Sequence, residues 1–186
     1  PWLIKSSDYK PPKCYLDTEH DVVTWILAPF SSADKDKLTH PPVIKEKQIY
    51  YHALDTSIME LADDICYSVH DLEDAISLKL VTRENFWPAF RKAGGTTSFL
   101  YNIDEKIKSR FNNHEPIGTT LKKLFSPDSC IRKASIGRLI HLCIIHCRIG
   151  YNEVFEHPLL SLNAYLEEPF AQLQKQLEKV IVTLVI

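Results

Sequence analysis

The stretch that decides the fold of this sequence is Ile58-Met59-Glu60-Leu61-Ala62-Asp63-Asp64-Ile65-Cys66-Tyr67-Ser68-Val69-His70-Asp71-Leu72-Glu73-Asp74-Ala75-Ile76. It contains no proline or glycine, and its apolar residues recur at the three- and four-residue intervals of an α-helix. At about 100° per residue these apolar positions fall in one arc roughly 100° wide, which we expect to face a helical core. The arc consists of Ile58, Leu61, Ala62, Ile65, Val69, Leu72 and Ile76.

The opposite face of this predicted helix is acidic. It carries Asp63, Tyr67, His70, Asp71 and Asp74 and has no Lys or Arg. Oppositely charged pairs four residues apart are the usual arrangement on a surface helix. Carboxylates without counter-charges, interleaved with a tyrosine and a titratable histidine, suit a divalent cation or a polyhydroxyl ligand. A merely solvated surface explains the same pattern, so the residues alone leave both interpretations open.

The rest of the chain also has helical periodicity, and only five glycines occur in it. We expect a polar break over 31–42 and a short strand or turn at 151–155. The sequence therefore predicts an all-α bundle, divided into a loop and short helix at 1–44 and a helical domain at 45–186. The predicted helices cover about 17–27, 45–80, 82–93, 97–112, 126–150 and, as one or two helices, 158–179, with another short helical stretch after a turn at Pro116 and Gly118. Thr82 is the expected N-cap of the third helix, Gly94-Gly95 is its expected end, and Ser126-Pro127-Asp128 opens the helix at 126–150.

The composition is ordinary for a soluble globular protein, with 45% hydrophobic residues and a formal net charge of -2. This charge gives no support for nucleic-acid binding, and no apolar run approaches the ~20 residues that span a bilayer. The five cysteines lack regular spacing, which favours reduced thiols in a cytoplasmic protein. Cys143, His146 and Cys147 share one helical turn, but no second ligand pair accompanies them, so we favour buried thiols over zinc.

The run from Glu60 to Ala75 closely resembles a helix of the dGTPase-like triphosphohydrolases of the histidine–aspartate (HD) superfamily, written A-D-D-I-x-Y-x-x-x-D-L-E-D. Upstream, the run from Lys10 to Tyr15 resembles the lysine-rich loop that precedes this helix, and Pro1-Trp2 resembles the end of the family's Lys-Tyr-Pro segment. The resemblance is strong over roughly residues 1–80 and weaker beyond. It implies an HD-domain-like helical bundle that lacks the N-terminal part of the HD core.

The resemblance also implies roles for individual residues. Asp63 matches the final aspartate of the H…HD…D metal set, for which Mg, Mn or Fe is the expected divalent metal. Tyr67 would contact the substrate near its sugar and phosphates, and Asp71 would accept a hydrogen bond from the deoxyribose 3′-hydroxyl. His70 lies on the same face and is a further substrate-binding candidate. Arg132 could bind phosphates through its guanidinium, although an exposed first-turn cation is the alternative.

The activity that the resemblance implies is hydrolysis of a dGTP-like deoxynucleoside triphosphate to a deoxynucleoside and tripolyphosphate. The family's other metal ligands, a histidine and a His–Asp pair, lie upstream of the Lys-Tyr-Pro segment and are absent here. We therefore interpret the chain as the C-terminal part of a longer protein, and expect it alone neither to retain a metal nor to turn over substrate. A homo-oligomer is expected from the family, whereas nothing supports single-stranded nucleic acid as a partner.

Two alternatives stay open. The first is another HD-type nucleotide phosphohydrolase with a monophosphate substrate, although the positions of Tyr67 and Asp71 favour a triphosphohydrolase. The second is a non-catalytic helical interaction or regulatory module with a degenerate metal site. An upstream H…HD pair in the full-length gene would favour catalysis, and its loss would favour the module.

Overall fold

The computed structural model describes residues 15–40, 43–44, 47–48, 51–112 and 114–185. The chain forms two compact units, Pro1–Tyr51 and His52–Ile186. Pro1-Trp2 and the loop residues 10–14, which carry part of the family resemblance, lie outside the described residues. No helix in the described part of the chain has both the length and the apolar character needed to cross a bilayer.

The first unit contains two short helices and a small pair of strands. A 3-10 turn at Asp17–Glu19 leads into α1 (His20–Leu27), as expected from the sequence, and α2 (Ser32–Thr39) follows. The prediction of a polar break was wrong at α2, because the Ser31 hydroxyl accepts a hydrogen bond from the Asp34 backbone N–H and caps this helix. β1 (Val43–Ile44) pairs antiparallel with β2 (Lys47–Gln48).

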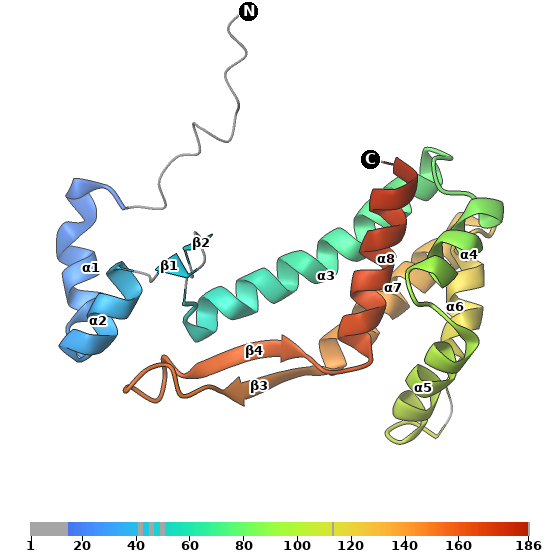
Figure 1. The fold of residues 1–186 in the computed structure, drawn as a ribbon. Coiled ribbons are helices and arrows are strands. Elements are labelled where there is room, and N and C mark those ends of the chain that lie inside the picture. Colours follow the sequence, from blue (N-terminus) through green and yellow to red (C-terminus); the bar gives the residue numbers. More distant parts are fainter. Residues whose placement is uncertain (1–14, 41–42, 45–46, 49–50, 113, 186) are drawn as a thin grey trace, which may run out of the picture. The chain divides into compact units, whose positions relative to one another are not determined.

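The second unit holds the remaining helices and one hairpin (Figure 1). All-α was the correct class, and the long predicted helix is present but begins at Leu54 rather than near residue 45. The elements in chain order are α3 (Leu54–Ser77), α4 (Arg83–Lys92), α5 (Thr97–Lys108), α6 (Ile117–Lys123), α7 (Ser129–Ile145), β3 (Cys147–Tyr151), β4 (Leu162–Leu166) and α8 (Phe170–Val185).

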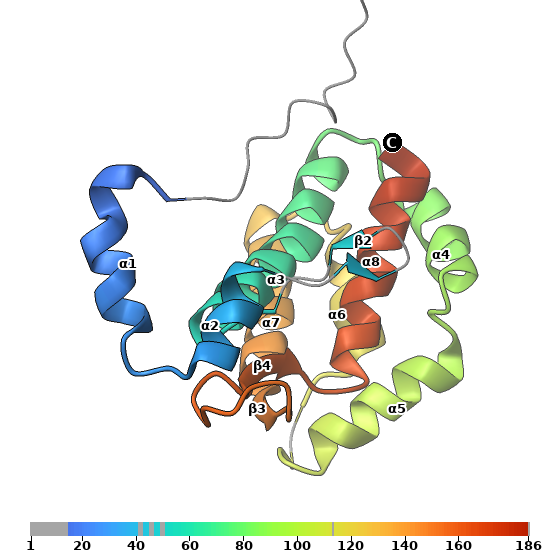
Figure 2. The ribbon, with the colours of Figure 1, turned by 60° about the vertical axis from the view of Figure 1, so that its left-hand side comes forward.

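The core of this unit lies where α3, α7 and α8 meet, with α4 against α8 and α6 against α7 (Figure 2). Burial of large apolar side chains is the main favourable contribution to such a fold. The largest fully buried apolar side chains come from all six helices of the unit and the loop after α6: Phe86, Phe90, Phe170, Leu72, Ile103, Ile107, Ile117, Leu121, Leu124, Leu139 and Leu177.

Local sequence signals account for several helix ends. The Thr82 hydroxyl accepts a hydrogen bond from the Asn85 N–H and begins α4, and the Asp128 carboxylate caps α7 through the Cys130 N–H. Gly94, at a φ of 107°, ends α4 as predicted. Gly95 is required by packing, since a Cβ there would lie 2.1 Å from the Phe90 ring.

The sequence predicted a short strand or turn at 151–155, where β3 ends, but not the hairpin of β3 and β4. α7 ends at Ile145 instead of near residue 150, and β4 occupies part of a region predicted to be helical. The strands pair antiparallel from Cys147 opposite Leu166 to Tyr151 opposite Leu162. β4 lies along α3, where the Ala164 N–H donates to the Ser57 hydroxyl at 2.8 Å. This hydrogen bond gives a partner to a backbone N–H at the edge of β4. The local sequence could not predict it, because the two residues are far apart in the chain.

Candidate functional site on helix α3

Helix α3 buries one face, much as its periodicity predicts. Ile65, Val69 and Leu72 are almost completely buried, and Leu61 and Ile76 pack against the same core. The prediction was wrong for the two other members of the apolar arc. Ile58 is half exposed and Ala62 is exposed, and both line a hollow instead of packing into the core of the second unit.

These uncovered residues line an apolar hollow of about 450 Å³ between α3, the end of α7 and the hairpin. Ile144 and Ile149 also line it, and both side chains are exposed. Contiguous exposed apolar surface of this kind is unusual for a part of a protein that has no further partner.

The acidic face of α3, defined here as Asp63, Tyr67, His70, Asp71 and Asp74, is exposed to solvent. Within the part of the chain that the structure describes, none of its aspartates has a Lys or Arg within 4.0 Å. The structure thus brings these residues together along one helix face, and the carboxylates stay free to accept hydrogen bonds or to bind a cation.

A second hollow of about 440 Å³ lies beside Asp63. Ala62 and Cys66 line both this hollow and the apolar one, so the two are contiguous along α3. Glu60 also lines the hollow at Asp63, and its carboxylate Oε2 lies 2.5 Å from Nδ1 of His52. His52 therefore orients a carboxylate one turn of helix from Asp63.

His70 lies on the acidic face and has a partner on its own helix. Its Nδ1 is 3.6 Å from Oε2 of Glu73. When protonated, His70 would form an ion pair there, which is worth little at an exposed position. The His70 side chain is 55% exposed.

Arg132 lies apart from the acidic face. Its Nη1 donates to the carbonyl oxygens of Ser126 and Pro127 at 2.7 and 3.1 Å. It lines a pocket with Ile76 and Ser77 at the C-terminal end of α3. From Asp63 to Ser77 the helix rises about 21 Å. The structure does not bring this arginine together with the other predicted site residues.

A divalent metal would find only part of a coordination sphere here. Within the described residues, no group of three or more His, Cys, Asp or Glu side chains is placed to hold an ion. Asp63 can supply one carboxylate, which is the kind of ligand that Mg²⁺ and Mn²⁺ bind. The described residues therefore do not fit a complete metal site.

The cluster of Cys143, His146 and Cys147 is used in packing. His146 is fully buried, stacks on Phe170 at a centroid distance of 3.7 Å, and has Nδ1 2.7 Å from the Leu142 carbonyl oxygen. Burial raises the pKa of the Cys143 thiol to about 12, so the sulfur that a metal would need as thiolate stays protonated.

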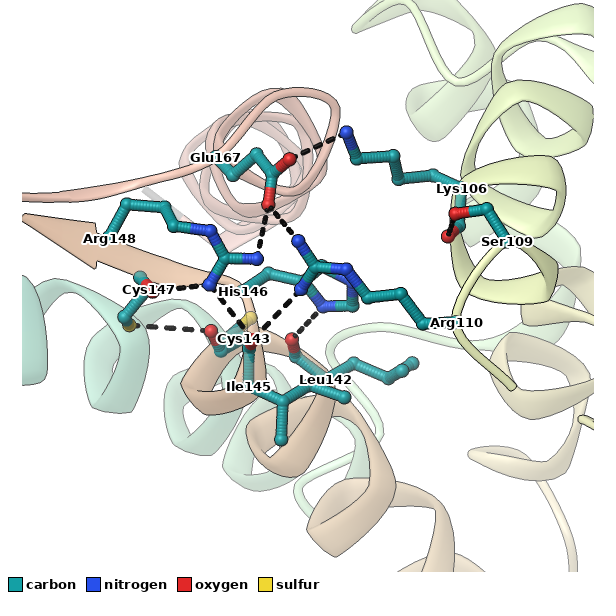
Figure 3. A network of polar contacts seen from close by, with 10 residues as sticks. All are labelled: Lys106, Ser109, Arg110, Leu142, Cys143, Ile145, His146, Cys147, Arg148 and Glu167. Carbon is teal, nitrogen blue, oxygen red and sulfur yellow. Dashed lines mark hydrogen bonds and ion pairs between the residues drawn. The ribbon is translucent and has the colours of Figure 1, made fainter.

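Sequence reasoning missed a network of charges around Glu167 (Figure 3). The Glu167 carboxylate lies 2.5 Å from Lys106 Nζ, 3.1 Å from Arg110 Nη2 and 2.8 Å from Arg148 Nη2. Both arginines also donate to the Ile145 carbonyl at the end of α7. These residues are far apart in the sequence, so no local pattern indicates that they meet. The network fastens α5, the end of α7 and the hairpin together.

The packed helices of the second unit form an all-α, HD-like bundle. No protein-family model matches the chain. It is 35% identical over 188 residues to a deoxyguanosinetriphosphate triphosphohydrolase-like protein of Shewanella oneidensis, covering 98% of this chain and 40% of that protein. Proteins of the same name from Shewanella baltica and Shewanella pealeana are 34% and 35% identical, with 90% of this chain covered in each alignment.

The chain belongs to the family of dGTPase-like triphosphohydrolase proteins. This confirms the family that the run from Glu60 to Ala75 resembles. The chain spans about two fifths of the length of these curated relatives, since it covers 40%, 37% and 36% of the three described above.

Proposed function

We propose that the protein represented by this chain hydrolyses a deoxynucleoside triphosphate of the dGTP type to a deoxynucleoside and tripolyphosphate. The acidic face of α3 carries this proposal. Asp63, Tyr67 and Asp71 follow one another at single-turn intervals, are exposed, and have no counter-cation among the described residues. The names of the relatives support a nucleotide triphosphate as the substrate.

Each of these residues has a distinct proposed role. Asp63 offers a carboxylate to a divalent cation, and Asp71 accepts a hydrogen bond from the 3′-hydroxyl of the deoxyribose. The Tyr67 ring, 59% exposed between them, contacts the sugar and the adjacent phosphate. A polar residue that must pair with one particular hydroxyl discriminates strongly, because the analogue without that hydroxyl leaves the carboxylate unpaired.

When bound, the divalent cation would neutralise part of the negative charge of the phosphates. Because Asp63 is the one predicted ligand among the described residues, we expect the isolated chain to be inactive. His70 is proposed to contact the substrate from the margin of the acidic face. The prediction that Arg132 binds the same substrate has little geometric support, since Arg132 lies at the other end of α3.

We further propose a cytoplasmic homo-oligomer. Cys66 and Cys130 are exposed free thiols, which suits a reducing compartment. The apolar hollow beside Ile58 and Ile144 offers a surface on which a second subunit could pack. Size-exclusion chromatography with light scattering would measure the oligomeric state, and a monomer at micromolar concentration would contradict this part of the proposal.

The experiment that tests the proposed function is an assay of the full-length protein with each of the four common deoxynucleoside triphosphates, in Mg²⁺ and in Mn²⁺. The expected result is release of tripolyphosphate together with a deoxynucleoside. Turnover of the deoxynucleoside monophosphates, assayed alongside, but of no triphosphate would favour another HD-type phosphohydrolase. No turnover of any nucleotide would favour the non-catalytic helical module.

A further inference from the structure

A separate pocket of about 350 Å³ lies at the C-terminal end of α3. Lys79 comes from the turn after α3, Arg83 from the first turn of α4, and Arg132 from the first turns of α7, so three elements each contribute a cation. Ser77, Thr82 and Ser126 also line the pocket, and no Asp or Glu is among its lining residues.

None of these cations forms an ion pair with the described residues. No Asp or Glu side chain there lies within 4.0 Å of Lys79, Arg83 or Arg132. Glu73, which lines a small neighbouring cavity with Arg132, is itself close to His70. Like charges that share a pocket repel one another unless an anion lies between them.

The positions of two of these cations are also unfavourable for the fold. Lys79 has a φ of 59°, the left-handed conformation that usually belongs to glycine at the end of a helix. Arg83 occupies the first residue of α4, where the positive end of the helix dipole disfavours a cation. A strained residue and a misplaced charge that meet at one pocket are a reason to look for a function there.

Arg132 is fixed in a position from which it can bind a ligand. One nitrogen of its guanidinium donates to the carbonyl oxygens of Ser126 and Pro127, which holds the side chain against the loop before α7. A guanidinium that is already ordered loses less conformational entropy when it binds an oxyanion. The pocket therefore combines a preordered arginine with two further cations. The Glu84 carboxylate lies outside the lining, where it interacts with the Thr82 hydroxyl and with the charge of Arg83.

We propose that this pocket binds the phosphate groups of a polyphosphate-bearing anion, at a site separate from the acidic face of α3. The site is some 20 Å along the helix from Asp63, so one short ligand cannot occupy both. The proposal goes beyond the proposed catalytic function and does not depend on it. The shared chemistry is a chain of phosphates, which either free tripolyphosphate or a nucleoside triphosphate would supply.

The test is a calorimetric titration of tripolyphosphate into the 186-residue chain at low ionic strength with a metal chelator present. We expect one saturable site, and Lys79→Asn should weaken binding about tenfold because one charge-assisted contact is lost. The thermal midpoint of Lys79→Asn should equal or exceed that of the parent, since Asn tolerates the left-handed conformation. Arg83→Gln should weaken binding similarly without loss of stability.

Lys133→Gln is the matched control, because Lys133 is exposed, neighbours Arg132 in sequence and does not line the pocket. It should leave the affinity for tripolyphosphate within about twofold of the parent, as expected for a screened surface charge. Equal losses in Lys133→Gln and Lys79→Asn would indicate non-specific attraction and overturn the proposal, as would an unchanged affinity in both pocket variants.

Two further titrations identify the source of the anion and distinguish this site from the proposed catalytic site. Titration with dGTP distinguishes the sources: an affinity equal to that of tripolyphosphate indicates that phosphates alone are recognised, and a higher affinity indicates a nucleotide. Asp63→Asn should leave tripolyphosphate binding intact. If Asp63→Asn abolished binding while Lys79→Asn did not, the phosphates would lie at the acidic face and the pocket would have no such role.

Discussion

The charges around Glu167 and the charges along α3 are arranged in opposite ways. At Glu167 one carboxylate meets Lys106, Arg110 and Arg148, which come from different elements. Along α3 the acidic side chains share one face, whereas Lys79, Arg83 and Arg132 line the pocket at its C-terminal end. Opposite charges that meet hold the fold together, whereas like charges that gather cost stability and leave their hydrogen-bonding groups available to a ligand.

The largest expected effect belongs to the acidic face. In the full-length protein, Asp63→Ala should lower kcat/KM by about 10³-fold, or ~4 kcal/mol, since the alanine removes a proposed metal ligand. Circular dichroism should show an unchanged helical content, because Asp63 is exposed and has no partner in the described chain. Asp64→Ala, at a neighbouring exposed position, is the control. Turnover near that of the parent in Asp63→Ala would remove the basis of the metal assignment.

A smaller effect is expected where the charges are paired. Glu167→Gln should lower the free energy of unfolding by about 1–2 kcal/mol, because three partly exposed cations lose the carboxylate that they share. Urea denaturation at neutral pH measures this loss. The control is Glu178→Gln, which makes the same replacement at an exposed position of α8 and should change stability by less than about 0.5 kcal/mol. Equal stabilities of the two variants would mean that the network contributes nothing to the fold.

The Glu167 network also predicts a pH dependence. The hydrogen bond from Lys106 is the largest effect and lowers the pKa of the Glu167 carboxyl below its ordinary 4.5. Burial opposes it, and the charge of Arg148 adds a smaller lowering of the pKa. A carboxyl whose pKa is lowered by folding stabilises the protein above about pH 4.5, and this contribution disappears as the pH falls through the folded-state value. The stability difference between the parent and Glu167→Gln should therefore shrink below about pH 4. A difference that stayed constant down to about pH 3 would contradict the assignment.

The smallest expected effect is a gain in stability when one charge is removed from the acidic face. Asp74 lies one turn after Asp71 and close to the C-terminal end of α3, where the helix dipole disfavours an anion. Asp74→Asn should therefore raise the free energy of unfolding of the chain by about 0.3 kcal/mol. Repeating the measurement in high salt should abolish the gain, since exposed charges are screened. A clear loss of stability would mean that Asp74 has a structural partner.

Helix α3 shows how much the sequence alone could predict. Its periodicity identified Ile65, Val69 and Leu72 as core residues and put Asp63 and Asp71 on the exposed face, because a helix of 3.6 residues per turn converts spacing into direction. The starts of α4 at Thr82 and of α7 near Asp128 were equally predictable, since a capping side chain acts within one turn of its own residue.

What the tertiary structure alone decided are contacts between residues far apart in the chain. The hairpin at β3 and β4 depends on packing against α3, and the Glu167 network joins positions as distant as Lys106 and Glu167. The pocket at Lys79 is lined by residues from the end of α3, the start of α4 and the start of α7. Local spacing cannot report such contacts, because their free energy is realised only after the chain between them has folded. The sequence by itself determined which face of α3 is exposed to solvent and which family the chain resembles. Only the fold decided where the paired and the unpaired charges lie.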